Sequence, residues 1–118
     1  MSFGVYFREL RKSKRFTQQQ ISEAIGKSVM LVSGVENGKN GPFSYHDLVI
    51  ISRVLDLSES ETSDLMRAAF ISRGILPKDI QDYLIQNDDA FTLLEVCAHK
   101  KPDRDTISQI LNIVKECK

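Results

Sequence analysis

The chain has 118 residues, no formal net charge at pH 7, and a composition that is 42% hydrophobic without tryptophan. This length allows one domain, or one small domain with an appendage. No apolar run approaches the ~18 residues of a membrane span, and no basic region followed by an apolar run opens the chain. Two cysteines, Cys97 and Cys117, are too few for a disulfide framework. We therefore expect a cytoplasmic, largely helical protein with no membrane partner.

The zero net charge conceals an uneven distribution. Residues 1–43 hold seven Lys/Arg and three Asp/Glu, whereas residues 44–118 hold nine and thirteen, so the two segments carry +4 and −4. A basic segment attracts DNA phosphate, and an acidic remainder keeps a protein soluble. Because imbalances of this size also arise by chance, the charge distribution alone leaves a nucleic-acid partner open.

Residues 2–14 predict a first helix with one apolar face. The basic side chains project elsewhere, and those near the C-terminal end also complement the helix dipole. A solvated charged face is the alternative to DNA contact here. Three of these side chains are candidates for contacts with phosphate: Arg11, Lys14 and Arg15.

Residues 17–37 predict two short helices joined by a tight turn. Gly26 suits a left-handed turn between them, and Ser28 offers a side-chain oxygen to the N-terminus of the second helix. This is the arrangement of a helix-turn-helix, whose second helix enters the major groove. Each helix has an apolar stripe at helical spacing, formed by Ile21, Ala24 and Ile25 in the first and by Val32 and Val35 in the second.

Several motifs follow one another in a specific order. A basic first helix and a Thr-Gln opening stand in RELRKSKRFTQQQISEAIG, which ends with the turn glycine, and Glu-Asn-Gly closes the second helix of the pair. Further on comes LVIISRVLDLS. On these motifs, residues 3–73 resemble the lambda-repressor-like (Xre-type) helix-turn-helix family. The resemblance implies a five-helix DNA-binding domain, usually dimeric, that acts as a transcriptional regulator.

The resemblance also implies contacts with the DNA backbone. The glutamine that opens the second helix commonly touches phosphate in this family and braces the recognition helix, which makes Gln18 a candidate. Lys27 replaces an apolar turn residue and adds a candidate phosphate contact. At the far end of the recognition helix, Asn37, Lys39 and Asn40 are placed to hold a phosphate strand, with ordinary turn chemistry as the alternative.

The recognition helix, about residues 29–37, departs from the family pattern. Its expected exposed positions are Val29, Met30, Leu31, Ser33 and Gly34, and only Ser33 has a hydrogen-bonding side chain. No side chain there can bind a purine through two hydrogen bonds. Gly34 would let the helix backbone approach the groove closely, at a cost of about 1 kcal/mol in helix propensity.

Three interpretations of the apolar positions remain open. Val29, Met30 and Leu31 contact thymine methyl groups while DNA shape supplies the remaining specificity. Alternatively, they form an exposed patch that binds a protein or the chain's own tail. In the third interpretation Met30 or Leu31 is buried, because the helix register differs by one. The whole predicted DNA-binding set is Gln18, Lys27, Ser28, Val29, Met30, Ser33, Gly34, Asn37, Lys39, Arg11, Lys14 and Arg15.

The remainder of the chain predicts only helices. Residues 44–55 and 58–73 complete a helix-turn-helix domain over residues 1–74. Three amphipathic helices follow, at about residues 78–86, 89–100 and 103–116. Roughly 40 residues cannot form a large core of their own, so these helices are expected to pack on the first domain, on a second copy, or on both. A homodimer is the economical answer.

The predicted fold is therefore all-α: a five-helix lambda-repressor-like domain followed by a short C-terminal helical dimerisation extension, residues 75–118. The Leu76-Pro77 opening and the Lys101-Pro102-Asp103 start of the final helix look similar to the C-terminal segments of mobile-element and stress-response repressors that a metalloprotease inactivates. That similarity implies a protease or another protein partner acting on the extension.

No catalytic motif is evident. Cys97 and His99 alone do not make a zinc site, which needs four ligands, and there is no phosphate-binding loop. We expect no enzymatic activity, no metal and no cofactor. The leading hypothesis is a dimeric repressor that binds a palindromic operator in double-stranded DNA through residues 29–37. The rival is a protein-interaction module, such as an antitoxin or an anti-enzyme factor, that uses Val29, Met30 and Leu31.

Overall fold

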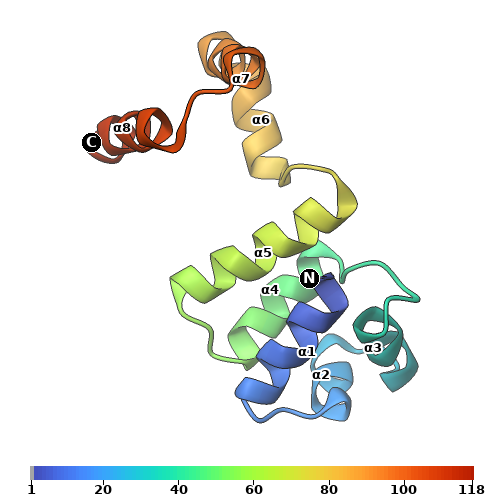
Figure 1. Cartoon of the computed structure of the whole chain (residues 1–118). Helices are drawn as coiled ribbons and strands as arrows, with labels where there is room; N and C mark the ends of the chain where they lie inside the picture. The colour runs from blue at the N-terminus through green and yellow to red at the C-terminus, as the bar shows by residue number, and fades with distance from the viewer. Residues whose placement is uncertain (1) are drawn as a thin grey trace. The chain divides into compact units, whose positions relative to one another are not determined.

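The computed structural model describes residues 2–118, which form eight helices and no strand, and this confirms the all-α prediction (Figure 1). The chain divides into two compact units, of which the first ends at Leu76 and the second is Pro77–Lys118. The helices of the first unit are α1 (Phe3–Ser13), α2 (Gln18–Ile25), α3 (Val29–Glu36), α4 (Tyr45–Val54) and α5 (Glu59–Arg73). Those of the second are α6 (Lys78–Gln86), α7 (Asp88–Lys100) and α8 (Arg104–Lys115).

The helix ends follow local capping chemistry, and their positions agree closely with the predicted ones. Thr17 and Ser58 each form a capping box with the residue three positions later. Gly26 and Gly74 end α2 and α5 in the left-handed conformation, with φ of 68° and 72°. The hydroxyl of Ser28 accepts a hydrogen bond from Leu31 N at the start of α3, as predicted. Short-range sequence signals therefore set where each of these helices begins and ends.

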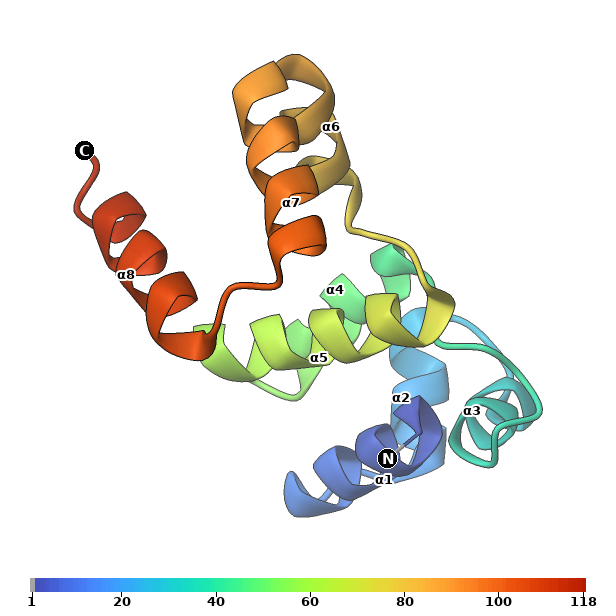
Figure 2. The same cartoon turned by 45° about the horizontal axis from the view of Figure 1, so that its top comes forward.

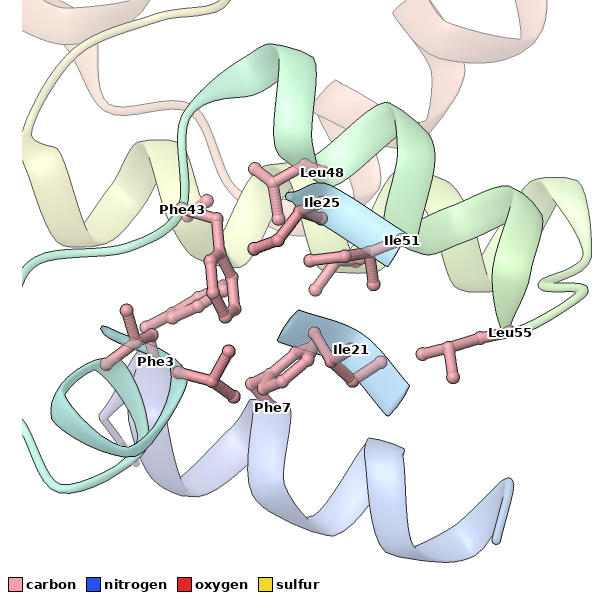
Figure 3. Packing of buried hydrophobic residues seen from close by; sticks show 12 residues of the cluster. Phe3, Phe7, Ile21, Ile25, Phe43, Leu48, Ile51 and Leu55 are labelled. Carbon is pink, nitrogen blue, oxygen red and sulfur yellow. The ribbon is translucent and has the colours of Figure 1, made fainter. Parts of the chain in front are cut away.

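The core of the first unit takes apolar side chains from all five of its helices, and Figure 3 shows these side chains converging. Phe43, from the loop before α4, inserts an aromatic ring against α1. Its ring meets that of Phe7 edge to face, with the centroids 4.9 Å apart and the planes at 69°. The cluster is completed by Phe3, Ile21, Ile25, Val32, Val35, Leu48, Ile51, Leu55, Leu65 and Ala69.

Helix α1 crosses the C-terminal end of α3 at Gly4. A Cβ atom built on Gly4 would lie 2.5 Å from the carbonyl oxygen of Glu36 and would also overlap the carbonyl of Val35. Any larger residue would push the two backbones apart. Glycine at this position therefore sets how closely α1 can brace α3.

In the second unit, α6 and α7 lie side by side as an antiparallel hairpin, whereas α8 packs on neither of them (Figure 2). No residue of these three helices is fully buried. Even Cys97, on the apolar stripe of α7, is only half-buried. None of the helices within residues 2–118 is long and apolar enough to cross a membrane.

Candidate nucleic-acid interface

The turn between α2 and α3 presents the start of α3 to solvent. Gly26 reverses the chain and Ser28 caps the new helix, so α3 begins at Val29. The inner face of α3 is buried through Val32 and Val35. The accessible surface at α3 is therefore formed by the first turn of the helix and by the loop that follows it.

Only two side chains of α3 extend freely into solvent. Met30 is 83% exposed and Val29 is 42% exposed. Leu31 instead lies half-buried against the core. The expectation of three adjacent exposed apolar residues is therefore wrong for Leu31. Of the two residues considered for burial, Leu31 is therefore the one that points inward, and Met30 points outward.

Gly34 does not lie open to a groove. It is buried, and a Cβ atom added to it would overlap Nδ2 of Asn40 and lie 3.0 Å from Cγ of the same side chain. The backbone N–H of Asn40 donates to Gly34 O over 3.0 Å. The loop after α3 thus folds back over Gly34, and the prediction that Gly34 permits close approach of DNA is corrected: the close neighbour is Asn40.

This arrangement creates a shallow hollow between α3 and its following loop. Five of the predicted DNA-contacting residues besides Gly34 line it together: Ser28, Met30, Ser33, Asn37 and Lys39. Asn40 also lines it, although sequence reasoning placed this residue only at the phosphate strand. The signal for its position was the glycine inside α3, which leaves room for a neighbouring side chain.

A buried ion cluster fixes α3 against α1 and α2. The side chain of Glu36 is fully buried, and its Oε2 accepts from Arg11 Nε over 2.7 Å while its Oε1 accepts from Arg11 Nη2 over 2.9 Å. Gln18 Nε2 donates to the same carboxylate over 3.1 Å, and Arg8 Nε lies 3.4 Å away. Burial alone would raise the pKa of Glu36, but these hydrogen bonds and the Arg11 charge lower it below its usual value.

The cluster corrects one predicted phosphate contact. Arg11 is buried, and besides Glu36 its guanidinium donates to the carbonyl of Phe16 over 2.7 Å. It is therefore committed to the protein interior rather than to phosphate. Gln18 is half-buried and joins α2 to α3 through Glu36, which is the bracing position that the family resemblance implied.

The remaining predicted cations fall into two groups. Lys14 Nζ lies 3.0 Å from Glu61 Oε2, and Lys27 Nζ lies 2.6 Å from Asp47 Oδ2, so these two charges are neutralised locally. Arg15 and Lys39 are exposed, and neither forms an ion pair within the part of the chain that the structure describes. The predicted basic surface is therefore narrower than the sequence suggested.

The described residues contain no group of three or more His, Cys, Asp or Glu side chains that could hold a metal ion. Cys97 and Cys117 are both free thiols. The chemistry available at the α3 hollow is thus that of hydroxyl, amide, ammonium and thioether groups.

In this five-helix unit the third helix packs against α1 and α2, and its first turn is exposed. This arrangement is typical of helix-turn-helix proteins. Residues 2–65, more than half of the chain, match the family described as "Helix-turn-helix domain", and the chain belongs to that family. The match agrees with the lambda-repressor-like resemblance. No curated protein and no solved structure matches the chain. Membership suggests a DNA-binding regulator, and proteins of this family are typically not enzymes.

Proposed function

We propose that this protein is a dimeric repressor that binds a palindromic operator through α3. The observation that carries the proposal is the position of α3. Its inner face and Glu36 are held against α1 and α2, while Val29, Met30 and the following loop are exposed. A recognition helix needs both properties, because base contacts require a rigid element with an accessible first turn.

Phosphate contacts would come mainly from two exposed cations of the first unit. Arg15 and Lys39 carry no competing ion pair within residues 2–118, so both are available to the DNA backbone. The Lys14–Glu61 pair is partly exposed on both sides, and such a pair is worth only about 0–1 kcal/mol, so a phosphate can compete for Lys14. Lys27 is held more firmly, because its partner Asp47 is buried and would lose its counter-charge if Lys27 turned to a phosphate. The N-terminus of α2 adds free N–H groups at Gln18.

The salt dependence of binding to a 30-base-pair duplex tests this proposal. Log affinity should fall linearly with log salt, at a slope of about −0.9 for each phosphate neutralised. Lys39→Ala and Arg15→Ala should each reduce that slope by about one. The matched control is Arg67→Ala, an exposed arginine on α5, a helix that does not pack on α3; its slope should match that of the wild type. An affinity independent of salt contradicts the proposal.

A homodimer would be formed through the second unit. On α8 the apolar residues Ile107, Leu111 and Val114 recur at helical spacing and are 43%, 49% and 58% exposed. A two-fold dimer buries such a surface and presents two recognition helices to one operator. A protease that removes this extension would then release the operator by dissociating the dimer.

Deletion of residues 103–118 should convert a dimer into a monomer in sedimentation velocity at micromolar concentration. A truncated chain that remains dimeric rules out α8 as the interface. A full-length chain that sediments as a monomer at the same concentration rules out the dimer itself.

The second candidate function, a protein-interaction module, is favoured by the high exposure of Met30. Met30→Gln separates the two functions without disturbing Leu31, which contributes to the core. A protein interface centred on this residue would be lost. A DNA-binding protein would retain its phosphate-dependent affinity and change its preferred sequence.

A further inference from the structure

We infer that Met30 is a specificity-determining residue that reads the C5-methyl group of a pyrimidine in the major groove, which in ordinary DNA is thymine. This inference rests on the proposed function, since it assigns a sequence preference to the same recognition helix. It follows from the apolar side chains that α3 exposes and from its lack of exposed hydrogen-bonding side chains.

Hydrogen-bonded base reading from α3 itself is nearly absent. The helix carries no Arg, Lys, Asn or Gln between Val29 and Glu36. The hydroxyl of Ser28 caps the helix, Ser33 is half-buried, and Glu36 is enclosed by its own partners. A purine read through two hydrogen bonds therefore finds no matching side chain on this helix.

The two side chains of α3 that do protrude, Val29 and Met30, are both apolar, and Met30 is the more exposed. At 83% exposure Met30 is the most exposed of the large hydrophobic residues in the part of the chain that the structure describes. It stands on the first turn of α3, and the N-terminal residues of a recognition helix are those that contact base edges. Among the four bases, only thymine offers an apolar group on its major-groove edge.

Met30 is an apolar side chain with polar residues around it, which suits a single apolar contact among polar ones. The hollow beside it is bordered by the exposed residues Asn37 and Lys39, whose groups can bind phosphate or exposed base edges. A flexible thioether adapts to the shape of a small methyl group. Burying one methyl group is worth about a fourfold gain in affinity. Each half-site of the operator should therefore contain one position where a 5-methyl pyrimidine is preferred.

The experiment begins with duplexes selected by the full-length protein from a random-sequence pool. Each thymine of the selected duplex is then replaced singly by uracil, which pairs identically and lacks only the methyl group. The wild type should lose about fourfold in affinity at one position per half-site. Replacing that T·A pair by 5-methylcytosine·G should give tighter binding than replacing it by cytosine·G.

The variants assign the methyl contact to Met30. Met30→Ala should bind thymine and uracil duplexes equally, and Met30→Leu should retain most of the discrimination. Ile71→Ala is the matched control, because Ile71 is 72% exposed on α5; its ratio of thymine to uracil affinity should equal that of the wild type. Thermal unfolding of each variant checks that the fold is retained.

The outcomes separate this inference from the proposed function. A selected duplex whose affinity changes less than twofold with uracil at every position overturns the inference and leaves sequence-specific DNA binding intact. The same holds if Met30→Ala keeps the wild-type discrimination, since another group then reads the methyl. If no duplex is enriched and binding is independent of salt, both the proposed function and the inference fail.

Discussion

The two units are built from similar amphipathic helices but differ in what those helices bury. Every fully buried apolar side chain of the described residues lies in the first unit, whereas α6, α7 and α8 contribute none. The apolar face of α8 is as regular as that of α1, yet Val114 on it is 58% exposed. An apolar stripe therefore specifies that a helix needs a neighbour, and only the tertiary structure decides whether that neighbour lies within the same unit.

The largest effect is expected at the buried ion cluster. Arg11→Met leaves the carboxylate of Glu36 buried without its main partner, which should lower the free energy of unfolding by about 3–5 kcal/mol. Urea unfolding of the full chain measures this loss. Arg67→Met, at an exposed arginine, is the control, and it should leave the free energy of unfolding almost unchanged. A loss below about 1 kcal/mol for Arg11→Met would mean that α3 is held mainly by its apolar contacts.

Replacing one leucine by alanine in each unit compares how much each apolar face contributes to stability. Leu48 is fully buried, so Leu48→Ala should cost about 2–5 kcal/mol at any protein concentration. Leu111 is 49% exposed, so Leu111→Ala should leave the unfolding of the monomer unchanged. If the proposed dimer forms through α8, the cost of Leu111→Ala should appear only at concentrations where that dimer is populated. Equal, concentration-independent costs at both sites would contradict the distinction between the units.

The close crossing of α1 and α3 gives a smaller effect. Gly4→Ala should destabilise the protein by about 1–3 kcal/mol, because a backbone contact cannot relax as a side chain can. Gly41→Ala is the matched change, since nothing lies within 4 Å of an added Cβ atom there. Thermal unfolding compares the two variants. Equal stability of both would show that α1 moves away from α3 at little cost.

The smallest expected effect is on acid stability. Since the folded state lowers the pKa of Glu36 below its ordinary value of 4.5, this carboxylate stabilises the protein above about pH 4.5. The contribution should be lost as the pH falls through the lowered pKa. The difference in unfolding free energy between the wild type and Glu36→Gln should therefore shrink below pH 4.5. A constant difference from pH 7 to pH 3 would mean that Glu36 does not titrate in that range.

Much of the candidate site could be predicted from local patterns. The Ser28 cap, the Gly26 turn and the inward stripe of Val32 and Val35 are short-range signals, and they located α3 correctly. Helical spacing placed Val29, Met30 and Leu31 together on the exposed side, but it did not decide whether Met30 or Leu31 is the buried one. What could not be predicted was the partner of each charge, because Lys14 and Lys27 meet carboxylates 47 and 20 residues away along the chain.

By itself, then, the sequence determined the helices, their caps, the helix-turn-helix family and the departure of α3 from a polar reading surface. These features depend on residues within about four positions of one another, where helical geometry brings side chains and backbone groups together. The tertiary structure alone decided that Arg11 is enclosed with Glu36, that Asn40 covers Gly34, and that Leu31 turns inward while Met30 remains free. Each of these depends on how closely α1 and the loop after α3 approach that helix, which is a property of the packed core.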